Sequence, residues 1–76
     1  MSEFDPTEAV ALALELPGRQ REVLVRLGRC MSYKEIADDL GISIKTVGVH
    51  SQRIFNKLRI CSTAQAVRVA VAAKLV

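Results

Sequence analysis

The chain has 76 residues and a net charge of +3, and half of its residues are hydrophobic. Three residues are aromatic and none is Trp, so the core must be built from Leu, Ile, Val and Ala. This length and composition predict one small domain of packed helices. No apolar run approaches the roughly 20 residues of a membrane span, and no signal sequence opens the chain. We therefore expect a cytoplasmic protein with no membrane partner.

The charge is distributed unevenly along the chain. Residues 1–16 hold four acidic residues and no basic one, which gives −4, whereas residues 17–76 hold eleven basic residues against four acidic ones, which gives +7. A basic body behind a short acidic segment favours a polyanionic partner such as nucleic acid. Charge alone leaves open a basic surface that binds nothing acidic.

The sequence predicts a first helix from Pro6 to about residue 15 or 16. Asp5 is suited to its N-cap, Pro6 to its first position and Glu8 to its third. Pro17 and Gly18 end this helix. A second helix is expected over residues 19–27, where three apolar side chains recur on one face: Val23, Leu24 and Leu27.

A third and a fourth helix are expected on either side of a very short turn. Ser32 and Glu35 have the spacing of a capping box and open the third helix, which stops at Gly41. Ser43 caps the fourth helix, which runs to Leu58. Two helices joined by a three-residue turn with Gly form a helix-turn-helix. Ala37 before the turn and Val47 after it supply the small and apolar residues that a steep crossing needs, although an ordinary helical hairpin is the alternative.

A fifth helix is expected from the cap at Ser62 to about Lys74, and it is apolar nearly all round. One stripe is expected to face the core: Ala66, Val67 and Ala70. That assignment leaves Val69, Ala72 and Ala73 without a core to join, and an exposed apolar patch usually marks an interface. The first helix has two alternative roles: it covers part of the last helix, or it extends a dimer.

Three segments of the sequence, "REVLVRL", "SYKEIADDLGISIKTVGVHSQRIFNKL" and "AQAVRVA", resemble the LuxR/NarL-type helix-turn-helix domain. The resemblance runs from Leu16 to Val76. It implies an all-α, LuxR-type four-helix domain over residues 17–76, with residues 1–16 as an extra N-terminal helix. It also implies that the helix from Ile44 to Leu58 enters the major groove of DNA and that the last helix mediates dimerisation. The chain is then either a stand-alone member without a receiver or ligand-sensing domain, or a fragment.

The sequence departs from the family pattern at several positions. Pro17 replaces a capping Thr, Gln20 a Glu, Tyr33 an Asn, and Cys30 a Gly whose backbone would be strained if left-handed. Gly48 replaces the Lys of T-V-K, and it has two interpretations. Either the bare backbone lets the helix approach the bases more closely, or the groove surface has been lost because the protein acts on another protein.

The resemblance assigns the DNA-facing residues of the fourth helix. The base-facing positions are Gly48, Val49, Gln52 and Arg53. Val49 can pack on a thymine methyl, Gln52 can pair with adenine, and Arg53 can bind guanine or a phosphate. Phosphate contacts are expected at the starts of the third and fourth helices, where a helix N-terminus favours an anion, and at the far end of the fourth: Tyr33, Lys34, Ser43, Lys45, Thr46 and Lys57. His50 is expected to be packed rather than to read bases.

These observations predict a sequence-specific regulator of transcription that binds duplex DNA as a homodimer, with Val69, Ala72 and Ala73 at the dimer interface. The alternative is a protein-interaction module that binds and inhibits another LuxR-type regulator. No enzymatic motif, metal cluster or phosphate-binding loop is present in the sequence, so no cofactor and no small-molecule ligand is expected. Cys30 and Cys61 are too far apart for a zinc or redox motif and are expected to be reduced, partly buried thiols.

Overall fold

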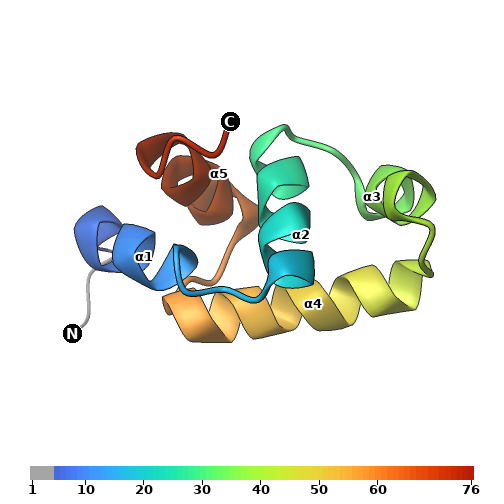
Figure 1. Cartoon of the computed structure of the whole chain (residues 1–76), viewed down its shortest axis with the longest axis horizontal. Helices are drawn as coiled ribbons and strands as arrows, with labels where there is room; N and C mark the ends of the chain where they lie inside the picture. Colours follow the sequence, from blue (N-terminus) through green and yellow to red (C-terminus); the bar gives the residue numbers. More distant parts are fainter. Residues whose placement is uncertain (1–4) are drawn as a thin grey trace.

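The computed structural model describes residues 5–76, and this part of the chain is all-helical, without strands (Figure 1). The all-α prediction is therefore confirmed. Glu3, one of the four acidic residues counted above, lies outside the described residues. The helices are α1 (Pro6–Ala13), α2 (Gly18–Gly28), α3 (Tyr33–Leu40), α4 (Ile44–Leu58) and α5 (Thr63–Ala72).

Side-chain caps fix the starts of four helices. The Asp5 carboxylate accepts the backbone N–H of Thr7 at 2.9 Å, and the capping box between Ser32 and Glu35 is complete. The hydroxyl groups of Ser43 and Ser62 likewise cap α4 and α5. Each cap satisfies a backbone donor that lacks a partner inside the helix. α2 starts after Pro17 without a side-chain cap, as its sequence predicted.

A residue with left-handed backbone follows each of four helices. These residues are Cys30 (φ 62°), Gly41 (φ 67°), Arg59 (φ 57°) and Lys74 (φ 59°). The residue after each of them donates its backbone N–H to the carbonyl five residues earlier, as in a Schellman motif. One example is the N–H of Met31, which donates to the carbonyl of Arg26 at 3.1 Å. Three of the four positions carry a side chain, although only Gly adopts this conformation without steric cost. The strain that the sequence suggested at Cys30 is thus present.

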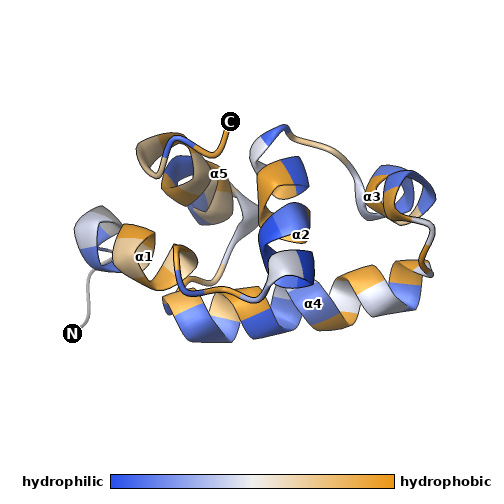
Figure 2. Ribbon diagram, viewed as in Figure 1, coloured by the Kyte–Doolittle hydropathy of each residue, from blue (hydrophilic) through white to orange (hydrophobic). Residues whose placement is uncertain are grey.

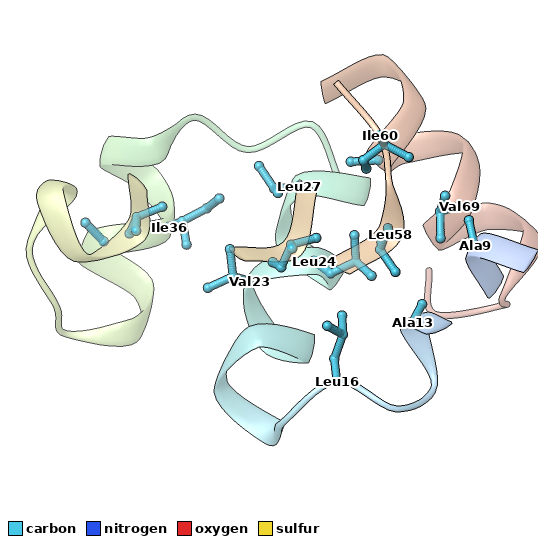
Figure 3. Packing of buried hydrophobic residues seen from close by; sticks show 14 residues of the cluster. Ala9, Ala13, Leu16, Val23, Leu24, Leu27, Ile36, Leu58, Ile60 and Val69 are labelled. Carbon is cyan, nitrogen blue, oxygen red and sulfur yellow. The ribbon is translucent and has the colours of Figure 1, made fainter. Parts of the chain in front are cut away.

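The core lies where α2 meets α4 and α5 (Figure 3). Val23, Leu24 and Leu27 on one face of α2 are at most 1% exposed, as their spacing predicted. Ile36 of α3 and Ile54 of α4 are completely buried in the same cluster. Burial of such side chains stabilises a fold by about 1.5–3 kcal/mol each, so this cluster holds the helices in place.

α2 and α5 approach each other closely because Gly28 has no side chain. A Cβ atom added at Gly28 would lie 2.5 Å from the Cβ of Ala70 and 3.1 Å from a methyl group of Val76. Any side chain at this position would therefore push α5 away from α2. The small residues at the contact set the distance between the two helices.

α1 covers α5, and this contact corrects one sequence prediction. Val69 was expected at an exposed dimer interface, but it is completely buried together with Ala66 and Ala70. Figure 3 shows Val69 beside Ala9 of α1, and α1 packs against α5. The extra helix supplies the core that Val69 would otherwise lack. Val67, which was expected in the core, is only half-buried.

Some smaller expectations also differ from the structure. α1 ends at Ala13 rather than near residue 15, because the chain turns there and buries Leu16 against the core. α5 ends at Ala72, two residues before the left-handed Lys74. Both cysteines are free, as expected, but they are exposed, because they lie in the loops after α2 and α4. Within residues 5–76 no helix is long and apolar enough to span a membrane.

Candidate nucleic-acid interface

The predicted helix-turn-helix is formed by α3 and α4. Gly41, Ile42 and Ser43 separate the two helices, and the left-handed backbone of Gly41 makes the sharp bend. The N–H of Ile42 donates to the carbonyl of Ala37 at 3.0 Å, which ties the turn to the end of α3. Ala37 is 4% exposed and lies where the helices cross. The turn therefore holds α4 at a fixed angle to α3.

α4 has one buried face and one uncovered edge. Its buried residues are Val47, Ser51, Ile54 and Leu58. The other helices all lie on one side of α4 in Figure 1, which leaves the opposite edge open along the length of the helix. Figure 2 shows that this helix carries both hydrophilic and hydrophobic residues. An α-helix with a free edge of this kind has the diameter to enter the major groove of DNA.

The base-facing residues assigned from the sequence lie along this open edge. Val49 is 43% exposed, and the side chains of Gln52 and Arg53 are exposed. Gly48 is half-buried, and a Cβ added there would meet nothing within 4 Å. The gap left by the missing side chain is therefore open to solvent rather than filled by the protein. The amide nitrogen of Gln52 donates to the amide oxygen of Asn56 at 3.1 Å.

Several of the expected phosphate-binding residues lie at the start of α4. Lys45 is exposed and makes no ion pair within residues 5–76. The hydroxyl groups of Ser43 and Thr46 lie 2.8 Å apart, and the Ser43 hydroxyl also accepts the N–H of Thr46 at 3.0 Å. These two hydroxyl groups are thus partly occupied by the helix cap. Lys45 is the residue at this end whose charge is available to an anion.

The residues at the start of α3 differ in exposure. The ammonium group of Lys34 is exposed, whereas Tyr33 is half-buried because it packs against the hydrophobic core. Tyr33 therefore has a structural role in addition to any contact of its hydroxyl group. α4 starts at the turn, whereas α3 ends there, so the start of α3 lies one helix length away from the turn.

The basic residues at the far end of α4 form exposed ion pairs with acidic residues, which the sequence did not predict. The ammonium group of Lys57 lies 3.5 Å from the carboxylate of Glu15, and the guanidinium of Arg59 lies 3.3 Å from the carboxylate of Glu8. Lys57 is also twelve residues from Lys45, which is about 18 Å along a helix. The structure therefore does not place Lys57 with the other expected phosphate-binding residues.

Two further exposed residues of α4 were given no role by the sequence assignment. Ile44, at the first position of α4, is 52% exposed. Asn56 holds the amide of Gln52. The spacing between Gln52 and Asn56, four residues on one helix, was the signal that would have linked them.

Two buried polar atoms of α4 have no hydrogen-bond partner within residues 5–76. They are the Nδ1 atom of His50 and the hydroxyl oxygen of Ser51, and Ser51 is 1% exposed. His50 is half-buried, as expected for a packed residue. Among the described residues, no cluster of His, Cys, Asp and Glu is arranged to hold a metal ion.

Comparison with known proteins places this fold in a family. Residues 15–70 match the family described as "Bacterial regulatory proteins, luxR family". "Transcriptional regulatory protein UhpA" of Escherichia coli is 40% identical over 53 residues, which cover 70% of this chain and 27% of that protein. The protein of the same name from Salmonella typhimurium is 39% identical over 64 residues, which cover 79% of this chain and 33% of that protein. No solved structure matches the chain.

The chain thus spans about a third or less of the length of these curated relatives. The matched family segment begins just before α2 and ends within α5, so it includes the whole helix-turn-helix, whereas α1 lies outside it. We conclude that the chain belongs to the luxR family of bacterial regulatory proteins and contains that family's DNA-binding helix-turn-helix domain.

Proposed function

We propose that this chain regulates transcription in the cytoplasm by binding duplex DNA sequence-specifically, with the open edge of α4 in the major groove. The observation that carries this proposal is the group of exposed residues along that edge. Lys45 and Arg53 make no ion pair within residues 5–76, and Val49 and Gln52 lie between them on the same helix. A free edge with basic, amide and apolar groups matches what base edges and phosphates present.

Each residue of the edge has a distinct role in this proposal. Val49 packs on a thymine methyl group, and Gln52 pairs with adenine through its amide. Arg53 binds a guanine or a phosphate. Lys45 binds a phosphate near the start of α4, where the helix dipole also attracts an anion. Lys34 at the start of α3 contacts a phosphate of the DNA backbone.

Gly48 supports close approach of the helix to the bases. The space beside its Cα is open, so the backbone can lie nearer to a base edge than a longer side chain would permit. Gly48→Lys tests this role, because the added side chain has room in the free protein. Close approach predicts a weaker DNA complex with an intact fold. Stronger binding would mean that Gly48 only removed a phosphate contact.

We also propose that two copies pair through the part of α5 that remains exposed. Val69 is excluded from this surface because it lies in the core. Val71 is 58% exposed, Ala72 is exposed and Ala73 is half-buried. Small side chains on this face allow a second helix to approach closely. Sedimentation at tens of micromolar tests the pairing, and a strictly monomeric chain would contradict it.

Selection from random duplexes at 0.1 M salt tests the DNA-binding function itself. We expect enrichment of a defined sequence, and two half-sites about 10 bp apart if the chain pairs as proposed. Failure to enrich any sequence, together with binding to another luxR-family regulator, would support the alternative function of an inhibitor of such a regulator. Arg53→Ala serves as the control and should weaken the enriched complex.

A further inference from the structure

Gln52 and Asn56 form a hydrogen-bonded pair on the open edge of α4. The Nε2 atom of Gln52 donates to the Oδ1 atom of Asn56 at 3.1 Å, one helical turn further along. Both side chains are exposed. Exposed amides gain little stability from pairing with each other rather than with water. The consequence of the pair lies instead in the groups that Gln52 presents outward.

A Gln side chain has a donor end and an acceptor end of nearly the same shape. Rotation of the amide by half a turn exchanges the two ends, and a free Gln can present either order to a base. In the structure Asn56 presents its oxygen rather than its NH₂ group to Gln52, so the NH₂ group of Gln52 turns toward Asn56. One Nε2 hydrogen is used in this bond. The second Nε2 hydrogen and the Oε1 atom remain available.

The remaining groups match one base in the major groove. Adenine presents an acceptor, N7, beside a donor, the N6 amino group. An amide held with one N–H and its oxygen outward can donate to N7 and accept from N6. Guanine presents two acceptors, N7 and O6, and cannot satisfy the oxygen of this amide.

We propose that Asn56 is a positioning residue that holds the Gln52 amide in the order required for adenine. This inference rests on the proposed function, because it assumes that α4 lies in the major groove. Asn56 acts through Gln52 and need not touch the DNA. Pre-ordering the amide also reduces the side-chain entropy that is lost when the base is bound.

A double-mutant cycle on the enriched duplex tests this role. Binding of the wild type, Gln52→Ala, Asn56→Ala and the double mutant is measured on two duplexes. The duplexes differ at one base pair, the position at which Gln52→Ala removes the preference for A·T, and this pair is A·T in one duplex and G·C in the other. We expect Gln52→Ala to reduce the preference for A·T over G·C at least fivefold, and Asn56→Ala to reduce it about threefold. The double mutant should then match Gln52→Ala, because Asn56 has nothing left to position.

A conservative variant separates positioning from structural support. Asn56→Asp keeps an acceptor toward Gln52 and adds a negative charge, so it should retain the base preference while binding both duplexes more weakly. Unchanged melting temperatures across the set would show that the fold is intact. An Asn56→Ala effect that persists in the Gln52→Ala background, or that is equal on both duplexes, would overturn the inference. A preference at Gln52 for G·C would also overturn it.

The result also distinguishes this inference from the proposed function. A wild type that enriches a sequence, together with an Asn56→Ala variant of unchanged base preference, contradicts the positioning role and leaves DNA binding intact. A wild type that enriches no duplex contradicts both.

Discussion

The two ends of α4 differ in what surrounds their positive charges. The open end, residues 44–53, carries Lys45 and Arg53 without ion pairs in the described part of the chain. The closed end, residues 54–59, carries Lys57 and Arg59, which pair with Glu15 and Glu8. Both ends belong to a basic body, yet within residues 5–76 the charges of Lys45 and Arg53 are not offset by an ion pair, whereas those of Lys57 and Arg59 are. Net charge therefore identifies the class of partner, whereas local pairing decides where the partner binds.

The closed end also rests on a different kind of packing. α1 lies beside it and packs in turn against α5, and the residues buried there include Ala9, Ala13 and Val69. The open end carries exposed apolar groups instead, at Ile44 and Val49. The core holds both ends of the helix, since Val47 at the open end is also completely buried, but only the open end presents exposed apolar groups to a ligand.

The largest effect on stability is expected from a substitution in the core between α1 and α5, beside the closed end. Val69→Glu places a carboxylate in a completely buried position and should lower the free energy of unfolding by roughly 3–5 kcal/mol. Ala64→Glu, exposed on the same helix and outside the proposed pairing surface, should change it by less than about 0.5 kcal/mol. Urea unfolding followed by circular dichroism measures both. A folded, equally stable Val69→Glu variant would contradict the burial of Val69.

The difference in charge between the two ends predicts unequal effects of matched substitutions. Lys45→Gln should weaken binding of the enriched duplex roughly 5–10-fold at 0.1 M salt and reduce the salt slope by about 1. Lys57→Gln should change the affinity about twofold or less, because its charge is already paired with Glu15. Titrations of both variants at several salt concentrations measure this. Equal effects would place the whole of α4 against the DNA.

The left-handed residues before and after α4 give a second matched pair. Gly41→Ala forces a side chain into left-handed backbone and should destabilise the fold by about 1 kcal/mol. Arg59→Gly relieves the same strain and should stabilise it by up to about 1 kcal/mol, reduced by loss of the exposed ion pair with Glu8. Thermal unfolding checks the two signs. If Arg59→Gly destabilises the fold, its contacts outweigh its backbone strain.

Removing the carboxylate of Glu15 at the closed end should leave a basic residue there without an ion pair, as at the open end. Glu15→Gln frees Lys57 and raises the local positive potential, so DNA affinity should rise about twofold at low salt and less at high salt. Glu22→Gln, which removes a carboxylate paired with Arg19 on α2, is the control for net charge. An equal gain in both variants would mean that only the net charge matters.

The smallest effect concerns pH and the cap of α3, which supports the open end. The Ser32 backbone and side chain hydrogen-bond Glu35 and lower the pKa of its carboxyl group. The folded pKa is therefore below the unfolded one, so the contribution to stability is present above the unfolded pKa. It is lost as the pH falls through the folded pKa. The stability difference between the wild type and Glu35→Gln should shrink between pH 6 and pH 3. A difference independent of pH would show that the charge is not involved.

The amino-acid sequence by itself determined where helices start and turn. Ser32, Ser43 and Ser62 cap helices through bonds to groups only three residues away. Gly41 bends the chain through its own backbone. Such short-range features need no tertiary partner, so the pattern of caps and apolar spacing predicted the five helices, the helix-turn-helix and the exposed edge of α4.

Only the tertiary structure decided how the far end of the molecule is assembled. Arg59 and Glu8 are 51 residues apart in the chain, and their pairing requires α1 to lie beside the end of α4. The burial of Val69 likewise depends on α1, because every face of α5 is apolar enough to be a core face. A local pattern cannot choose among equivalent faces, since the choice follows from which helix packs against them.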